Sequence, residues 1–306
     1  MRSVRSRTTA LLSGLAAAGI ALTACGGPPA ADSDGKIDVV ASTTVWGDVV
    51  REIGGDSVDV ESIISDPAAD PHSYESTPQD AARISDADLV VYNGGGYDEF
   101  IEQTISASGQ DKPTIAAVPE EAGGHDHGHE HDHSGNEHVW YDLDLLPETA
   151  QRIADELGRL QPENAERFQQ QAAAFRDRIG ALQRKVADIA AAHGGEPVLV
   201  TDPIAHYLIE STELNDITPQ SFVRAVEAES DPSAAAVAEI HNAIESGQAR
   251  LLIYNPQTES PVTRNVRTAA EQKQLPIVEM TETLPEGQTY LQWMDAQISA
   301  LQNALD

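Results

Sequence analysis

Residues 163–192 read ENAERFQQQAAAFRDRIGALQRKVADIAAA, and apolar side chains recur along them every three or four positions. The recurring residues are Phe168, Ala172, Phe175, Ile179, Leu182, Val186 and Ile189. This spacing predicts one amphipathic helix. The helix would have ~30 residues and a length of ~45 Å, enough to run the length of a small domain. A shorter helical stretch begins near Pro147, and Gln161-Pro162 suggests a break between the two. We therefore expect a helical region at 147–193 that resists bending.

Short β-branched strands alternate with helices on both sides of this region. Before it we expect strands at Ile37–Ala41, Val58–Ile64 and Leu89–Tyr92, and helices at Thr44–Ile53 and Gln79–Ser85. After it we expect strands at Val198–Thr201, Arg250–Tyr254 and Ile277–Met280, separated by alanine-rich helical segments. Such alternation is typical of mostly parallel sheets covered on both faces. The prediction is an α/β fold with an N-terminal lobe at 37–146 and a C-terminal lobe at 194–306. One long rigid helix would join the lobes, with a cleft between them.

The first 24 residues have the pattern of a secretory signal peptide. Three arginines precede an apolar run from about Ala10 to Leu22, and small residues follow it. The alternative is a membrane-spanning anchor, but the run is shorter than the ~20 residues that cross a bilayer, and Ser13 and Gly14 interrupt it. The sequence therefore favours export with removal of residues 1–24.

Cys25 is the only cysteine of the chain, so no disulfide can form within it. The tetrapeptide at 22–25, Leu-Thr-Ala-Cys, resembles the bacterial lipobox, which implies that Cys25 is lipidated. Small and polar residues follow it, so residues 25–36 are expected to form a flexible tether. These features predict an extracytoplasmic protein that is lipid-anchored to the cell membrane.

The chain is strongly acidic, with 50 Asp and Glu against 19 Lys and Arg and a formal net charge of −31. Such a surface repels nucleic acid and attracts cations diffusely. It identifies no ligand, because an acidic surface that keeps the protein in solution explains the charge equally well.

Residues 123–137, GGHDHGHEHDHSGNE, form a segment unlike the rest of the chain. Its five histidines alternate with acidic or small residues at His125, His127, His129, His131 and His133. No core can form from this composition, so we expect a mobile surface loop. Imidazoles and carboxylates at this density favour borderline metals such as zinc, copper and nickel.

Four other side chains follow predicted strands or turns. His72 comes after a strand and a proline turn, His138 follows the histidine-rich loop, and Asp202 and Glu282 each follow a strand of the second half. Ligands in open α/β sheets lie beyond the carboxyl ends of strands. Each position alone has an ordinary explanation, such as a helix N-cap. Four such positions in two lobes that flank one cleft predict a metal site.

These residues carry a resemblance to a known family. The segments in question are Asp-Pro-His-Ser-Tyr-Glu at 70–75, Asn-Gly-Gly-Gly-Tyr at 93–97, His-Val-Trp at 138–140, Tyr-Asn-Pro-Gln at 254–257 and Thr-Glu-Thr at 281–283. Together with the long helix they resemble the metal-binding class of ABC-transporter solute-binding proteins, the zinc and manganese lipoproteins. The resemblance extends from Ile37 to the end of the chain. It implies two α/β lobes, a metal held between them and delivery to a membrane permease.

The resemblance also implies a ligand set. His72 and His138 match the two histidines of the family's first lobe. At the third position zinc-favouring members resemble a His-Asp-Ala pattern, whereas this chain has Asp202-Pro203-Ile204, with His206 four residues on. Asp202 looks more like the manganese-type arrangement, and His206 is the alternative third ligand. Glu282 matches the fourth position, which is usually an aspartate.

Two imidazoles and two carboxylates satisfy either zinc or manganese. The histidine-rich loop favours zinc, because manganese binds most weakly in the divalent series. We therefore expect high-affinity capture of zinc by a monomer, with manganese as the alternative, and a low-affinity collecting or sensing role for the loop.

Two other functions stay open. A membrane-tethered zinc hydrolase could use Glu75 as a base, but the sequence lacks the His-Glu-x-x-His motif and a nucleophile elbow, and we expect Glu75 to support a ligand histidine instead. The second open function is that of a metal-buffering or adhesion lipoprotein without a permease partner. The glycines at 94–96 predict a tight turn rather than a phosphate loop, and Trp46, Trp140 and Trp293 are expected in the core.

Overall fold

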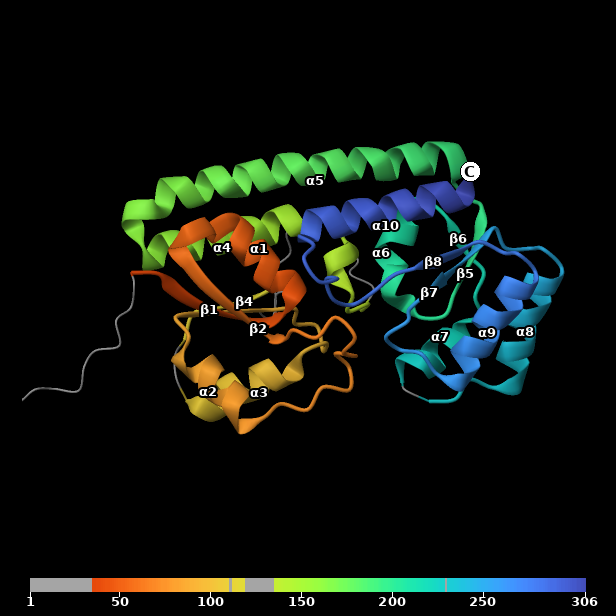
Figure 1. Cartoon of the computed structure of the whole chain (residues 1–306), viewed down its shortest axis with the longest axis horizontal. Coiled ribbons are helices and arrows are strands. Elements are labelled where there is room, and N and C mark those ends of the chain that lie inside the picture. The colour runs from red at the N-terminus through yellow and green to blue at the C-terminus, as the bar shows by residue number, and fades with distance from the viewer. Residues whose placement is uncertain (1–34, 110–111, 119–134, 229) are drawn as a thin grey trace, which may run out of the picture. The chain divides into compact units, whose positions relative to one another are not determined.

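A computed structural model describes residues 35–109, 112–118, 135–228 and 230–306 (Figure 1). Cys25 and the five histidines of the predicted loop lie outside these residues. No helix in the described ranges has both the length and the apolar character needed to cross a membrane.

Two four-stranded parallel sheets organise residues 35–306. The first has the strand order β2-β1-β3-β4, with β1 (Ile37–Thr43), β2 (Val58–Ile64), β3 (Leu89–Tyr92) and β4 (Thr114–Ala116). The second has the order β6-β5-β7-β8, with β5 (Pro197–Val200), β6 (Asn215–Asp216), β7 (Leu251–Tyr254) and β8 (Ile277–Glu279). All strand pairs are parallel. The predicted α/β class and its parallel sheets are confirmed.

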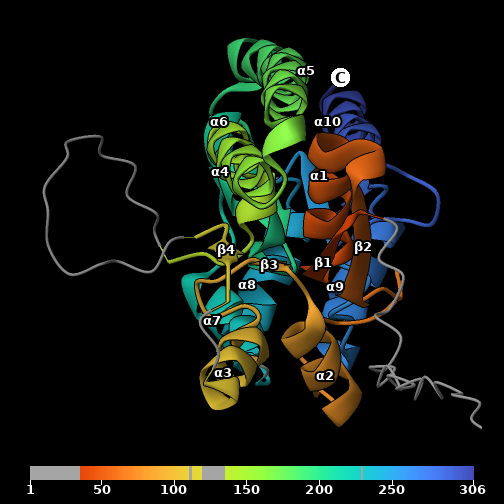
Figure 2. The ribbon, with the colours of Figure 1, turned by 90° about the vertical axis from the view of Figure 1, so that its left-hand side faces the viewer.

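Helices cover both faces of the first sheet. Helices α1 (Thr44–Gly54) and α4 (Leu145–Leu160) lie on the face toward the long helix, and α2 (Pro78–Asp86) and α3 (Glu99–Ser108) lie on the other (Figure 2). Alternate residues of β1 pack in two different cores. Val39 and Ala41 pack in the larger core, and Val40 packs in the smaller core under α2 and α3. This two-residue alternation is what a strand covered on both faces requires.

The second sheet is covered in the same way. Helices α7 (Gln220–Glu227), α8 (Ala234–Glu245) and α9 (Pro261–Gln272) pack on one face, where Leu199 and Leu252 join a separate apolar cluster. The other face, with Val198 and Val200, packs in the larger core beside α6 (His206–Ser211) and α10 (Tyr290–Leu305).

The long helix α5 (Ala165–His193) has 29 residues, and every apolar side chain of the predicted stripe is buried. Helix α4 ends at Leu160, and a 3-10 turn at Pro162–Asn164 makes the predicted break. The stripe of α5 belongs to one apolar cluster that includes strands of both sheets, so a continuous core joins the two lobes. Helix α10 packs beside α5 (Figure 1). This second helix was not predicted from the sequence.

Smaller features follow the sequence with two exceptions. Glycines 94, 95 and 96 all have positive φ angles, as the predicted turn requires, and Trp46, Trp140 and Trp293 are buried. The edge strands β4 and β6 were not predicted, because strands of three and two residues are too short to show an alternating pattern. Within the described ranges, three further 3-10 turns lie at Gly55–Ser57, Val139–Tyr141 and Pro203–Ala205.

Candidate metal centre

His72 lies in the connection between β2 and α2. The preceding Asp70-Pro71 pair shapes this segment, because the Asp70 Oδ1 atom accepts a hydrogen bond of 3.0 Å from the backbone N–H of His72. The Ser73 hydroxyl donates to the backbone oxygen of Asp70 at 3.2 Å. Two local hydrogen bonds therefore fix the backbone on both sides of the imidazole.

His138 immediately precedes the 3-10 turn Val139–Tyr141 and is only 2% exposed. Its ring packs edge-on against Trp140, with ring centroids 5.3 Å apart. Its Nε2 atom is buried and makes no hydrogen bond. A buried imidazole nitrogen without a hydrogen bond is costly unless it has another partner, such as a metal ion.

The second sheet supplies two carboxylates, each directly after a strand. Asp202 follows β5 and caps the next turn, where its Oδ1 atom accepts a hydrogen bond from the backbone N–H of Ile204 at 2.9 Å. Its Oδ2 atom accepts one from the Thr258 hydroxyl at 2.8 Å. Glu282 follows β8 and is fully buried.

Neutral donors hold the Glu282 carboxylate from both lobes. Its Oε1 atom accepts a hydrogen bond of 2.7 Å from the Asn255 amide, which follows β7. Its Oε2 atom accepts one of 3.0 Å from the hydroxyl of Tyr97, in the glycine turn of the first lobe. Two hydrogen bonds, one to each oxygen, thereby fix the carboxylate.

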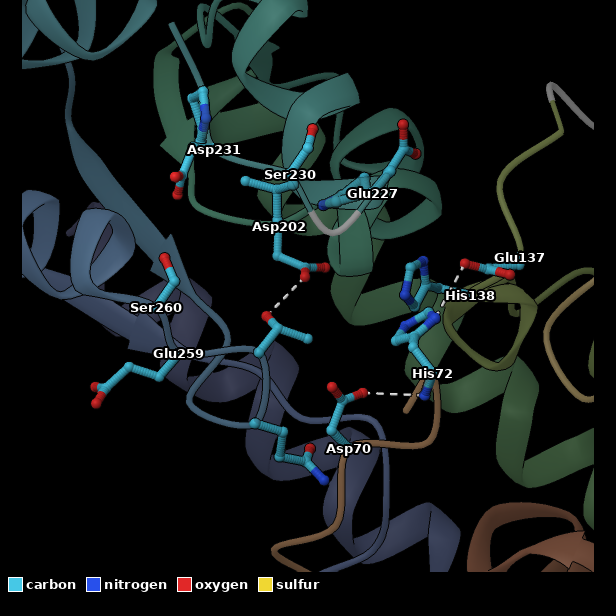
Figure 3. A pocket seen from close by; sticks show the side chains of 15 residues that line it. Asp70, His72, Glu137, His138, Asp202, Glu227, Ser230, Asp231, Glu259 and Ser260 are labelled. Atoms are coloured by element: carbon cyan, nitrogen blue, oxygen red, sulfur yellow. Dashed lines mark hydrogen bonds and ion pairs between the residues drawn. The ribbon is translucent and has the colours of Figure 1, made fainter. Parts of the chain in front are cut away.

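These four side chains converge. The Glu282 Oε1 atom lies 3.6 Å from Nε2 of His72 and 3.5 Å from Nε2 of His138. Single donor atoms of His138, Asp202 and Glu282 all lie within 4.8 Å of one another. His72, His138 and Asp202 border a pocket of about 270 Å³, and Figure 3 shows both imidazoles on one side of it with Asp202 across from them. The predicted set of His72, His138, Asp202 and Glu282 is brought together at one place.

Opposite charges perturb the ionisation of the four groups. Burial opposes a charge on His72, but contact with Glu282 and the negative charges of Glu137 and Asp202 raise its pKa to about 9. Burial likewise opposes a charge on His138, and the charge of Glu282 raises its pKa. Burial favours a neutral Glu282, yet the two imidazoles hold its pKa well below the usual range. Burial, followed by the charge of Glu282, raises the pKa of Asp202. Without a cation, the carboxylates thus favour the protonated forms of both histidines.

Glu137 lies beside these side chains and was not among the predicted site residues. Its Oε1 atom lies 3.4 Å from Nδ1 of His72, and single donor atoms of His72, Glu137 and His138 form a second group within 4.8 Å (Figure 3). Glu75, which we expected to support a ligand histidine, is exposed. The only feature of the sequence that could have indicated Glu137 was its position directly before His138.

His206 begins α6 and lies outside both of these donor groups, which were found among the described residues. It borders a neighbouring pocket together with Asn136 and Asp216. The carboxylate of Asp202, rather than the His206 imidazole, therefore stands beside Glu282 and His138.

Known proteins match this fold and sequence. Residues 39–304 match the family described as zinc-uptake complex component A, periplasmic (ZnuA). The zinc-binding lipoprotein AdcA of Streptococcus pneumoniae is 26% identical over 292 residues, covering 90% of this chain and 57% of that protein. The manganese ABC transporter substrate-binding lipoprotein PsaA of Streptococcus mitis is 30% identical over 181 residues, covering 55% of this chain and 57% of that protein.

Among solved structures, the periplasmic zinc binding protein TroA from Treponema pallidum aligns with a TM-score of 0.71 at 19% identity. The alignment covers 89% of this chain and 99% of that one, and it establishes the likeness of fold. The chain spans 57% of the length of AdcA and PsaA. Because the family match extends over nearly all the described residues, the chain belongs to the ZnuA family of periplasmic zinc-uptake components.

Proposed function

We propose that the protein captures one zinc ion between its lobes and delivers it to the permease of an ABC transporter. The observation that carries this proposal is the convergence of His72, His138, Asp202 and Glu282 around the buried Glu282 Oε1 atom. Two imidazoles and two carboxylates would leave the bound zinc electrically neutral. The family consists of substrate-binding transport proteins, which supports transport rather than catalysis.

The surroundings of the donors support zinc over manganese. His138, Asp202 and Glu282 are buried, and hydrogen bonds from Thr258, Asn255 and Tyr97 already occupy carboxylate oxygens. Each of these oxygens keeps a second lone pair for a metal ion, so one atom from each of the four side chains completes a four-coordinate zinc shell, whereas the higher coordination number of manganese would need further oxygen donors.

The amino-terminal segment supports delivery at a membrane. We propose that residues 1–24 direct export and that a lipid on Cys25 holds the mature protein, as a monomer, at the outer face of the membrane near its permease. Mass spectrometry of the membrane-extracted protein should show a lipid on Cys25, and Cys25→Ala should release the protein from the membrane fraction.

Elemental analysis of the purified chain tests the metal site. Wild-type protein should retain tightly bound zinc after dialysis, and His72→Ala and Asp202→Ala should each lose one equivalent. His193→Ala is a matched control, because His193 is also a partly buried histidine beside carboxylates but lies at the end of α5. Retention of that equivalent in both site variants would refute the assignment. Tighter binding of manganese than of zinc in competition would refute the choice of metal.

We also propose that the histidine-rich segment collects zinc weakly while the buried centre binds it tightly. Deletion of residues 124–135 should remove weak zinc equivalents and leave the tight one unchanged. Loss of the tight event would show that the two roles are reversed. Unchanged growth under zinc starvation after deletion of the gene would favour metal buffering over transport.

A further inference from the structure

Asn136 contacts both lobes at the edge of the centre and was not among the predicted site residues. Its Oδ1 atom accepts a hydrogen bond of 2.9 Å from the backbone N–H of His138 and lies 3.1 Å from Nδ1 of the same residue. Its Nδ2 atom donates a hydrogen bond of 3.1 Å to the backbone oxygen of Pro203, the residue after Asp202. One amide group therefore touches the imidazole of one lobe and the turn that carries a carboxylate of the other.

Backbone groups at both ends fix the orientation of this amide. The N–H of His138 can only donate, so the atom beside it must be the oxygen. The carbonyl of Pro203 can only accept, so the atom beside it must be the nitrogen. Exchanging the two atoms would break both hydrogen bonds, and the assignment therefore follows from the chemistry of the neighbours.

The orientation of the amide in turn selects the state of the His138 ring. An oxygen 3.1 Å from Nδ1 is an acceptor, so Nδ1 must carry a proton. In a neutral imidazole the lone pair then belongs to Nε2, the buried atom that faces Glu282. A metal ion that binds His138 would replace a proton on Nε2, while the proton on Nδ1 stays on the Asn136 side.

Further contacts hold Asn136 itself in place. The Tyr207 hydroxyl donates a hydrogen bond of 2.7 Å to its backbone oxygen, and the Asn93 amide donates one of 2.8 Å to the backbone oxygen of Glu137. Tyr207 belongs to the C-terminal lobe and Asn93 to the N-terminal lobe. Residues 136 and 137 are thus fixed by both lobes before any ion binds.

We propose that Asn136 is a positioning residue of the metal centre, which keeps His138 protonated on Nδ1 and couples its ring to the turn that carries Asp202. This inference rests on the proposed function, because it concerns the same centre. Groups that hydrogen-bond the second nitrogen of a ligand histidine typically change metal affinity by about 10–100-fold.

Two substitutions separate the roles of the amide. Asn136→Ala removes all three contacts of the amide, with the N–H and Nδ1 of His138 and with the backbone oxygen of Pro203, whereas Asn136→Asp keeps the acceptor beside His138 and removes the donor to Pro203. Asn164→Ala is the matched control, because the Asn164 amide also links two segments, at Ser57 and Gln161, but lies away from the centre. Each variant is measured in the full chain for zinc affinity by chelator competition and for thermal unfolding.

The decisive readout is the ring proton of His138 in zinc-loaded, ¹⁵N-histidine-labelled protein. Wild type and Asn136→Asp should show a proton on Nδ1 that exchanges slowly with solvent, and Asn136→Ala should lose this slow exchange. Zinc affinity should fall about 10–100-fold in Asn136→Ala and less than twofold in Asn164→Ala.

Two results would overturn the inference. Slow exchange and unchanged affinity in Asn136→Ala would show that the amide does not position the ring. Equal loss of the proton signal in Asn136→Ala and Asn136→Asp would show that acceptance at Nδ1 is not its role. Failure of the wild-type protein to bind zinc would instead refute the proposed function, so the two failures can be told apart.

Discussion

Neutralising Glu282 should destabilise the metal-free protein at low pH far more than at high pH. Glu282→Gln keeps the size and shape of the side chain but removes the negative charge that faces His72 and His138. In the metal-free protein that charge favours protonated histidines. The variant therefore removes a pH-dependent part of the free energy of unfolding.

The magnitude follows from His72, whose pKa is about 9 in the folded protein and 6.5 in an unfolded chain. A histidine with a raised pKa contributes stability that is fully present below its unfolded pKa and is lost as the pH rises through its folded pKa. At pH 6 this contribution is about 3 kcal/mol, and at pH 9.5 only a few tenths of a kcal/mol are left. The raised pKa of His138 acts in the same direction.

The assay is urea unfolding of chelator-treated protein at pH 6 and pH 9.5. The difference between wild type and Glu282→Gln in the free energy of unfolding should be larger at pH 6 by about 2–3 kcal/mol. Glu163→Gln, which changes an exposed glutamate, controls for the general effect of a charge and should show no such pH dependence. Equal destabilisation by Glu282→Gln at both pH values would refute the coupling between Glu282 and the histidines.

Three further outcomes follow from contacts in and beside the centre. Zinc binding at pH 7 should release about one proton from His72, because a metal displaces protons from its ligands, and the raised pKa of His138 adds to this release. Calorimetry in two buffers of different ionisation enthalpy measures the number of protons, and the share from His72 should fall as the pH rises past 9. Gln257→Leu should lower the free energy of unfolding by about 2 kcal/mol in urea titrations, because its amide donates to the backbone oxygen of Ala69 at 2.7 Å. Glu137→Gln should weaken zinc binding by about tenfold in chelator competition, because the charge beside Nδ1 of His72 is lost; equal affinity would show that this carboxylate does not support the ligand.

The sequence predicted those parts of the fold that depend on periodic burial. The stripe from Phe168 to Ile189 lies on one face of α5, and the predicted β-branched runs form the strands β1, β2, β3, β5, β7 and β8. The four converging donors could be named because each follows a strand or turn and the family resemblance singled them out. Parallel strands bring their carboxyl ends to one edge, so short sequence signals were sufficient.

The neutral residues around the donors could not be predicted in this way. Tyr97 and Asn255 bind the same carboxylate from different lobes, and Asn136 connects His138 with Pro203. Their roles depend on how the lobes are placed relative to one another, and no local pattern encodes that placement. Tyrosine and asparagine near turns usually have ordinary structural explanations, so their residue types gave no signal either.

Ligand exchange at this centre should involve the segment that carries His72 rather than a rotation of the lobes. Rotation would pull apart the apolar cluster that includes α5, α10 and strands of both sheets, and each buried apolar side chain exposed costs about 1.5–3 kcal/mol. The segment before His72 is held to the second lobe by hydrogen bonds from Gln257 to the backbone oxygens of Pro67 and Ala69, at 3.2 and 2.7 Å. Each such bond contributes only about 1 kcal/mol. The Gln257 oxygen accepts from the backbone N–H of Glu282 at 2.5 Å, so release of this segment also frees the backbone beside the buried carboxylate. The least costly opening therefore loosens one ligand from each lobe and leaves the continuous core intact.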